Sequence, residues 1–442
     1  MTVTPAISEP APPAGERPAH RDPNVLRWLG AYASSAMGDN VYYVALSWAA
    51  VQSGTPSQAG LVMALSAAPR ALLMLGGGVI ADRFGPRRVL IASNGVRCAA
   101  VVAVALLLLV SSPGLWLLGL LALVFGVVDA VLMPALGALP ARLTARGQLA
   151  RVQGMRGMAG RLANVVGAPL GGLGVALGGA AAAFGAAALL FTISLPLLTA
   201  VRMGPRPSPQ EWPAAGGEAT GHGPPAGPEL PAGQELPGRP TAARELRDGL
   251  HHIRRNPVLA RLIVVIALTD LGFVGPLNVG LTLLADERGW GAPGMGWVLA
   301  GFGAGAGTMS LLLTVRGRVP RAGLALSVAI AVGAGAIGAL AYVPTVAAAV
   351  GVALAVGLLA GLSGALCGAL LQTESDPAYI GRVTSVSSLF SLGLAPLTFP
   401  VTGAAIALWG TGPVFAASAG VCALGGILGL CSRPLRRAEL PR

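Results

Sequence analysis

The chain has 442 residues, of which 54% are hydrophobic and only 11% are charged. Soluble domains carry roughly 25% charged residues, so the composition argues against a soluble protein and favours one that crosses a membrane several times. All 30 basic residues are arginines and give a net charge of +12, but they lie in short gaps between apolar runs, which argues against a nucleic-acid-binding surface.

The sequence lacks the motifs that would indicate an enzyme or a metal protein. Its four cysteines form no Cys-x-x-Cys pair. A nucleotide-binding loop of the Gly-x-x-x-x-Gly-Lys-Ser/Thr kind cannot occur without lysine, and neither a His-Glu-x-x-His motif nor a nucleophile elbow is present. We therefore expect no catalytic residue, no metal and no cofactor, and a multi-span membrane enzyme is a distant alternative.

Residues 1–24 are rich in proline and alanine and lack an apolar core, so we predict a disordered cytoplasmic tail rather than a signal peptide. Twelve apolar segments follow, each near the length that spans ~30 Å of hydrocarbon at ~1.5 Å per helical residue. They cover residues 25–50, 58–80, 89–110, 115–140, 151–176, 181–201, 257–284, 294–314, 322–342, 346–370, 382–407 and 412–431. The sequence therefore predicts an all-α membrane protein with twelve transmembrane helices.

Arginines concentrate in every second gap between these segments. The gaps after the second, fourth, sixth and eighth segments contain several arginines each, whereas the gaps after odd-numbered segments contain only Arg288. Because arginine is retained on the cytoplasmic side during insertion, we expect both termini in the cytoplasm. The predicted units are a six-helix half at 25–201, a cytoplasmic linker at 202–256 with a short amphipathic helix at 241–255, a second half at 257–431 and a tail at 432–442.

The two halves resemble each other at one constant spacing. Asp39 corresponds to Asp270, Arg151-Val152 to Arg382-Val383, and Pro169 and Gly172 to Pro400 and Gly403. Charges inside or beside membrane segments are rare, so the Asp and Arg-Val pairs carry most weight. This pattern predicts two parallel repeats of six helices, related by an axis along the membrane normal.

A charged turn joins the second and third segments, with the sequence Gly78-Val-Ile-Ala-Asp82-Arg83-Phe-Gly85-Pro-Arg87-Arg88. It resembles the loop between helices two and three of the major facilitator superfamily of secondary transporters. The resemblance implies that this loop latches the two halves in the outward-facing state, with Asp82 facing Arg382 at the start of helix eleven. Arg87 and Arg88 have a second interpretation, since arginines on this side also act as plain membrane anchors.

The first segment contains Gly38-Asp39-Asn40, then Tyr43, then Ala45-Leu46-Ser47-Trp48. This stretch resembles the first-helix signature of the macrolide-efflux-like exporters in the same superfamily. Asp39, Tyr43 and Ser47 recur about every fourth residue, so one helical face presents a carboxylate, a phenol and a hydroxyl. We expect that face to line the substrate cavity.

Further ionisable residues lie inside apolar segments, namely Arg70, Arg97, Asp129, Arg161 and Asp270. A charge at mid-membrane costs roughly 2.5–3.5 kcal/mol on insertion scales, so it normally faces water or a partner. Asp129, like Asp39, is a candidate for proton coupling, because a carboxylate there can take up and release a proton. The alternative is that these two residues only neutralise Arg97 or Arg161. Asp270 is the weaker candidate, and Arg70 has no assignable partner.

The fifth segment contains Gly167-Ala168-Pro169 and Gly171-Gly172. This stretch resembles the glycine- and proline-rich fifth-helix motif of exporters, with Ala168 inserted where the family pattern has glycine and proline adjacent. Small residues also let any two membrane helices approach closely, so generic packing is an alternative interpretation.

These features predict a transporter of the cytoplasmic membrane that exports amphipathic, drug- or macrolide-type molecules in exchange for protons. The expected partners are a small-molecule substrate, protons and the lipid bilayer, with no nucleic acid and no second subunit. We expect a cavity lined mostly by Gly, Ala, Leu and Val, which suits apolar cargo. Two alternatives are an uptake permease or facilitator on the same fold, and a transport-inactive sensor or scaffold.

Overall fold

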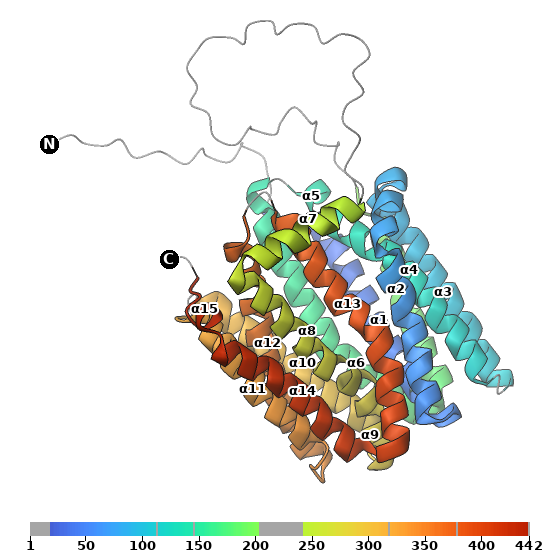
Figure 1. The fold of residues 1–442 in the computed structure, drawn as a ribbon. Helices are drawn as coiled ribbons and strands as arrows, with labels where there is room; N and C mark the ends of the chain where they lie inside the picture. Colours follow the sequence, from blue (N-terminus) through green and yellow to red (C-terminus); the bar gives the residue numbers. More distant parts are fainter. Residues whose placement is uncertain are drawn as a thin grey trace, which may run out of the picture.

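The computed structural model describes residues 18–111, 114–144, 146–202, 242–316, 319–376 and 379–440. Regular secondary structure in these ranges is helical throughout (Figure 1). The expected tail up to residue 17 and the linker residues 203–241 lie outside them. Residues 18–24, which were expected in the tail, are structured, because a 3-10 helix at Ala19–Arg21 leads into the first long helix.

Five long helices build the first half: α1 (Pro23–Ser53), α2 (Pro56–Phe84), α3 (Pro86–Val110), α4 (Leu115–Ala138) and α6 (Leu149–Thr199), with α5 (Pro140–Leu143) between the last two. α6 contains two of the expected membrane segments, because Gly178 and Gly179 leave helical geometry in its middle. Gly179 has φ +68°, which a residue with a Cβ atom rarely adopts, so this glycine permits the chain to turn back.

The second half begins with α8 (Pro257–Gly275), a π-helical turn at Pro276–Gly280 and α9 (Leu281–Glu287), which together form one span. It continues with α10 (Gly291–Arg316), α11 (Ala322–Leu340), α12 (Val346–Glu374), α13 (Ile380–Trp409) and α14 (Thr411–Cys431). Outside the spans, α7 (Ala242–Arg255) lies across one end of the bundle, and α15 (Arg433–Arg436) follows α14 (Figure 1). The twelve-helix fold predicted from the sequence is confirmed.

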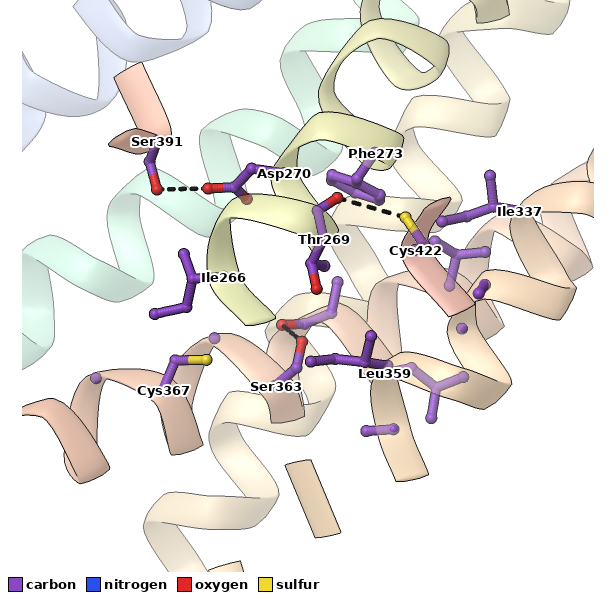
Figure 2. Close-up of a pocket in the computed structure, with 18 of the residues that line it drawn as sticks. Ile266, Thr269, Asp270, Phe273, Ile337, Leu359, Ser363, Cys367, Ser391 and Cys422 are labelled. Atoms are coloured by element: carbon purple, nitrogen blue, oxygen red, sulfur yellow. Dashed lines mark hydrogen bonds between the residues drawn. The ribbon is translucent and has the colours of Figure 1, made fainter. Parts of the chain in front are cut away.

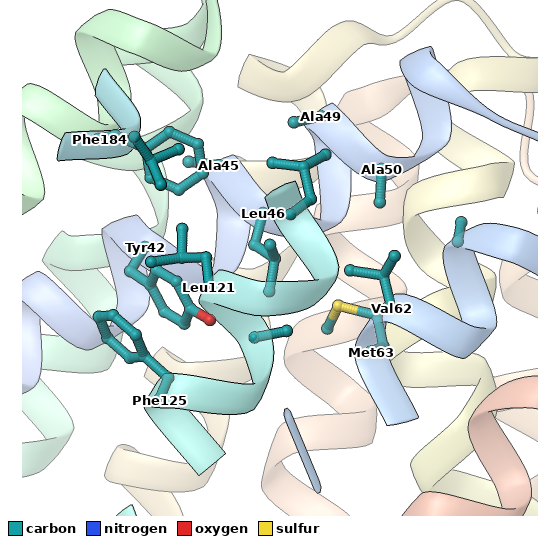
Figure 3. Close-up of a cluster of buried hydrophobic side chains, with 14 of the residues drawn as sticks. Tyr42, Ala45, Leu46, Ala49, Ala50, Val62, Met63, Leu121, Phe125 and Phe184 are labelled. Atoms are coloured by element: carbon teal, nitrogen blue, oxygen red, sulfur yellow. The ribbon is translucent and has the colours of Figure 1, made fainter. Parts of the chain in front are cut away.

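The interior of the first half is packed by side chains from α1, α2, α3, α4 and α6, part of which Figure 3 shows. The ring of Tyr42 stacks on that of Phe125, with centroids 3.6 Å apart and planes inclined by 10°. Met63 and Phe184 are buried in the same cluster. On the outside, many large apolar side chains are exposed, Leu72 by 78%, which fits a surface that contacts lipid.

The two halves meet along two seams. In the first seam, between α2 and α13, a Cβ atom added to Gly60 would lie 2.5 Å from the carbonyl oxygen of Phe399. A Cβ atom added to Gly403 would collide with the carbonyl oxygen of Pro56. These helices therefore touch backbone to backbone, which only glycine permits at the two positions.

The second seam, between α6 and α10, repeats this arrangement. A Cβ atom added to Gly172 would lie 2.5 Å from the carbonyl oxygen of Ala292, and one added to Gly296 would lie 2.6 Å from that of Ala168. Since Gly172 corresponds to Gly403 in the sequence repeat, the same internal symmetry relates the two seams.

Both seams lie toward the end of the bundle that contains α9, here called the α9 end. There Gln52 of α1 donates a hydrogen bond of 2.7 Å to Asp286 of α9, which joins the two halves. Thr411 at the start of α14 donates one of 2.6 Å to Glu287. The halves are thus in close contact at the α9 end, opposite to α7 (Figure 1).

Candidate functional site

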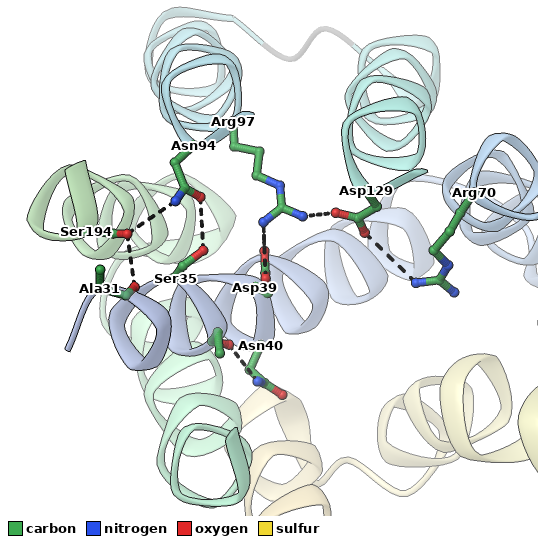
Figure 4. A network of polar contacts seen from close by, with 10 residues as sticks. Ala31, Ser35, Asp39, Asn40, Arg70, Asn94, Arg97, Asp129 and Ser194 are labelled. Atoms are coloured by element: carbon green, nitrogen blue, oxygen red, sulfur yellow. Dashed lines mark hydrogen bonds and ion pairs between the residues drawn. The ribbon is translucent and has the colours of Figure 1, made fainter. Parts of the chain in front are cut away.

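Arg97 of α3 is the centre of a group of charges inside the first half (Figure 4). Its side chain is only 1% exposed. Its Nη1 donates to Asp39 of α1, at 2.9 Å to Oδ1 and 3.2 Å to Oδ2, and its Nη2 forms an ion pair with Asp129 of α4. The planar fork of a guanidinium group can hold two carboxylates at once, which the ammonium group of lysine does less well.

Arg70 of α2 extends this group. Its Nη1 lies 4.0 Å from Oδ2 of Asp129. Asp39, Arg97, Asp129 and Arg70, here called the charge network, therefore connect four helices of the first half. Two carboxylates face two guanidinium groups, so the network is neutral, and this balance offsets much of the free energy needed to remove each ion from water.

Aromatic rings complete the surroundings of Arg97. Its Cζ lies 5.4 Å from the ring centre of Phe125 and 5.8 Å from that of Phe191, within the range of cation–π attraction. Arg161, which the sequence offered as a second counter-ion, lies elsewhere. It donates to the carbonyl oxygens of Ala306 at 3.3 Å and Gly307 at 3.5 Å, and so connects α6 with α10.

A chain of neutral polar groups on α1, α3 and α6 lies beside the charge network. Ser35 donates to Asn94 at 3.0 Å, Asn94 donates to Ser194 at 3.2 Å, and Ser194 donates to a carbonyl oxygen of α1 at 3.0 Å (Figure 4). Sequence analysis missed these residues, because isolated serines and asparagines carry little signal. The usable signal is that Asn94 precedes Arg97 by almost one helical turn, and so shares its face of α3.

A cavity of about 300 Å³ lies between the halves. It is lined by Asn40, Tyr43, Val44, Ser47, Arg70, Leu277, Asn278, Met295 and Leu299. The expected lining of mostly Gly, Ala, Leu and Val is therefore wrong for this cavity, since polar and charged side chains make up about half of it. Arg70 belongs both to this inter-half cavity and to the charge network, so it connects the two.

Asp39 lies apart from Tyr43 and Ser47, in contrast to the expectation that one helical face would present all three to one cavity. Its carboxylate turns toward Arg97 and lines a second cavity, of about 200 Å³, within the first half. Helical spacing alone would place the three together, but the ion pair draws Asp39 toward α3. The neighbouring Asn40 lines both cavities.

Asp270, the counterpart of Asp39, has different surroundings. Its carboxylate accepts a hydrogen bond of 2.5 Å from Ser391 of α13. Among the residues that the structure describes, no basic side chain forms an ion pair with it. The internal repeat thus places an acid in both halves but an arginine partner only in the first.

The predicted latch between Asp82 and Arg382 stays a prediction, because Asp82 and Gly78 belong to a stretch whose side-chain surroundings lie outside the described part. Arg382 itself lies over Tyr379, with its Cζ 5.2 Å from the ring centre. That ring in turn stacks on His252 of α7, with centroids 4.5 Å apart. Arg382 is therefore at the contact between α13 and α7.

The rest of the charged turn is described. Gly85 has φ +83°, which lets the chain turn between α2 and α3. Arg87 donates to the last carbonyl groups of α6, at 3.4 Å to one of them, and so anchors α6 within the first half. Arg83 lies 5.8 Å from the ring centre of the neighbouring Phe84, and Arg88 is exposed.

The fifth-helix motif packs α6 against two neighbours. Cβ atoms added to Gly167 and Gly171 would lie 2.7 and 2.9 Å from Cβ atoms of α1. Gly172 and Pro169 lie on the second seam with α10. Close helix packing therefore accounts for these four positions, whatever the direction of transport.

The sequence pattern that defines the Major Facilitator Superfamily matches residues 28–396. The chain belongs to this superfamily. No curated protein matches this major facilitator chain in sequence.

Solved structures share the major facilitator fold at low sequence identity. A variant of the nucleoside transporter NupG has a TM-score of 0.67 at 12% identity, covering 92% of this chain and 99% of that one. A D-xylose-proton symporter has a TM-score of 0.66 at 13% identity, covering 95% and 98%. A bacterial homologue of the human lysosomal transporter Spinster, inward-facing and occupied, has a TM-score of 0.62 at 16% identity, covering 94% and 97%. At these identities the likeness shows the fold alone.

Proposed function

We propose that this major facilitator protein is a proton-coupled exporter of amphipathic small molecules, such as drug- and macrolide-type compounds, and acts as a monomer in the cytoplasmic membrane. The observation that carries the proposal is that Arg70 both lines the inter-half cavity and forms the end of the charge network. Cargo in the cavity and a proton in the network can therefore act on the same side chain.

The charge balance of the network indicates how a proton acts. Protonation of Asp129 removes one of two negative charges and leaves the two arginines with an excess positive charge. Arg70 has the longest contact in the network, at 4.0 Å, so it is the group that separates most readily and turns to the cavity. Protonation of Asp39 weakens the hold on Arg97 in the same way. Either event changes the relative stability of two arrangements of the halves.

The two seams supply the contacts that must open and close. The arginine-rich gaps support a cytoplasmic position for both termini and for the end at which α7 lies. Contact along the seams then closes the path to the outside. Export requires the halves to separate at the α9 end and to close at the α7 end, which is the rocking motion expected of two matched repeats.

An uptake permease is the second candidate function. The observation that favours it is the polar lining of the inter-half cavity, where Asn40, Tyr43 and Asn278 could accept or donate hydrogen bonds to a hydrophilic nutrient. Both candidates use the same charge network, so the direction of flux separates them.

The test is the accumulation of a labelled hydrophobic drug in cells that express the protein. We expect several-fold lower accumulation than in control cells, restored by a proton-gradient collapser, and no such effect for Asp129→Asn. Glu439→Gln, which alters an exposed carboxylate outside the network, should export like the parent. Higher accumulation would indicate uptake, and unchanged accumulation would contradict drug export.

A further inference from the structure

The second half contains a further cavity, of about 350 Å³ (Figure 2). Every residue that lines it comes from α8, α11, α12, α13 or α14, so it lies within one half rather than between the two. Its wall is mostly apolar, with Ile266, Phe273, Ile337 and Leu359 among its larger side chains. A volume of this size falls at the lower end of the range of roughly 300–1,000 Å³ found for small-molecule sites.

Among the described residues that line this wall, Asp270 is the one that carries a charge. Ser391 donates to its carboxylate at 2.5 Å. The other hydroxyl groups shown nearby are engaged with their own helices, since Thr269 donates to the carbonyl oxygen of Val265 at 2.8 Å and Ser363 to that of Ala360 at 3.1 Å. The carboxylate thus accepts from one neutral donor, Ser391, and belongs to a residue that lines the cavity (Figure 2).

The five helices around the cavity offer no cation for this carboxylate. Besides Asp270, their charged residues are Arg261, Glu374 and Arg382, and none of them lines the cavity. The remaining titratable groups in the wall are the thiols of Cys367 and Cys422.

Comparison with the first half shows which partner the carboxylate of Asp270 lacks. There Asp39 has Arg97, whereas α11, the third helix of the second half, contains only Ala, Gly, Ile, Leu, Ser and Val. At the position that corresponds to Asp129, the second half has Ala360. The repeat thus keeps the acid, loses the arginine and has an apolar cavity beside the acid.

We infer that this cavity binds an amphipathic organic molecule with a single positive charge, such as a tertiary or quaternary amine, whose nitrogen lies against Asp270. A carboxylate removed from water needs a compensating positive charge, and an apolar wall favours an apolar body. A neutral sugar would leave polar groups unpaired against Ile266 and Leu359, and an anion would be repelled. As a statement about cargo, the inference rests on the proposed export function.

The test measures binding to the purified protein in detergent, where no proton gradient acts. The probe is radiolabelled trimethyl(2-naphthyl)ammonium, and its competitor is 2-tert-butylnaphthalene, which has the same shape without the charge. Asp270→Asn should weaken binding of the cation by about tenfold or more, equivalent to ~1.4 kcal/mol or more. The same variant should leave the affinity of the neutral competitor unchanged. Glu439→Gln should bind like the parent.

Ser363→Leu provides an independent variant that narrows the cavity and keeps the carboxylate. This variant should weaken the binding of the cation and of the neutral compound alike, which separates the role of shape from that of charge. Equal affinity of the cation for the parent and Asp270→Asn, or no saturable binding to the parent, would overturn the site. Intact binding without export in cells would instead count against the transport proposal, so the two failures are distinguishable.

Discussion

A buried arginine between two carboxylates is central to the stability of the first half. Arg97 is held by Asp39 and Asp129 and lies over the rings of Phe125 and Phe191. Loss of its charge would leave two like charges close together in a low dielectric. Removing one partner of a buried ion pair typically costs ~3–5 kcal/mol, because the other charge stays buried without compensation.

Arg97→Ala should therefore lower the thermal unfolding midpoint of the detergent-purified protein strongly, by an amount that corresponds to ~3–5 kcal/mol. Arg88→Ala, at an exposed arginine near the start of the same helix, serves as the matched control and should unfold like the parent. Adding Asp129→Asn to Arg97→Ala should restore part of the loss, because it removes one uncompensated charge. Equal midpoints for the two single variants would contradict a structural role of Arg97.

Sequence reasoning identified the members of the charge network but left open whether Arg97 or Arg161 is the partner of Asp39 and Asp129. Arg97, Asp39 and Asp129 stand out because charges inside apolar segments are rare. Arg70 had no partner in the sequence, since its contact with Asp129 depends on how α2 packs against α4. The isolation of Asp270 also required the structure, although the sequence held a signal for it: no residue of α11 can replace Arg97.

At the scale of helices, backbone contacts at glycine hold the halves together. Chain breaks were predictable, since Leu177-Gly178-Gly179 separates two apolar runs and becomes the break in α6. The seams were not, because the repeat singled out Gly172 and Gly403 without showing that they face the other half, and nothing in the sequence distinguishes Gly60 among 64 glycines. The π-helical turn at Pro276–Gly280 was also missed. It brings Leu277 and Asn278 into the wall of the inter-half cavity.

Gly403→Leu should open the first seam. An added side chain would collide with the carbonyl oxygen of Pro56, and overpacking of this kind costs about 1–3 kcal/mol, or roughly a tenfold change in the ratio of closed to open forms. The measurement is the rate at which a membrane-impermeant maleimide modifies Ser57→Cys, in a background whose four native cysteines are replaced by serine.

The rate of maleimide modification at the Ser57→Cys position should rise in Gly403→Leu. Gly393→Leu, on the same helix but with open space around an added Cβ atom, is the control and should leave it unchanged. If both leucines gave the same rate as the parent, the seam would not be the contact that closes this end.

At the scale of the whole molecule, the twelve helices and the two matched halves were predictable from apolar length and from the repeat. Nine helical stretches in the described ranges pass a test of length and apolarity for crossing a membrane, with Arg151–Thr199 counted as one. α1 is not among them, since Asp39, Asn40 and other polar residues interrupt it. Charged and polar residues that a site requires thus lower the hydropathy by which a membrane helix is recognised.

Cross-linking across the halves tests the rocking motion. Cysteines placed by Gln52→Cys and Asp286→Cys, at a contact of 2.7 Å between α1 and α9, should be joined by a short reducible cross-linker. Transport should then stop, because the halves can no longer separate at the α9 end, and a reductant should restore it. The control pair, Asn24→Cys with Arg202→Cys, lies within the first half and should leave transport intact when joined. Undiminished flux through the cross-linked Gln52–Asp286 pair would exclude separation at this end.

The seams described above are made of main-chain atoms, with glycine facing carbonyl oxygen in both. The surface along which the halves rotate therefore does not depend on the identity of the side chains that line either cavity. Substitutions in a cavity wall can change which compound is bound while the two seams keep their shape. On the proposed function, a few replacements around Asp270 or Asn278 would therefore redirect such a chain to new cargo and leave the seams unchanged.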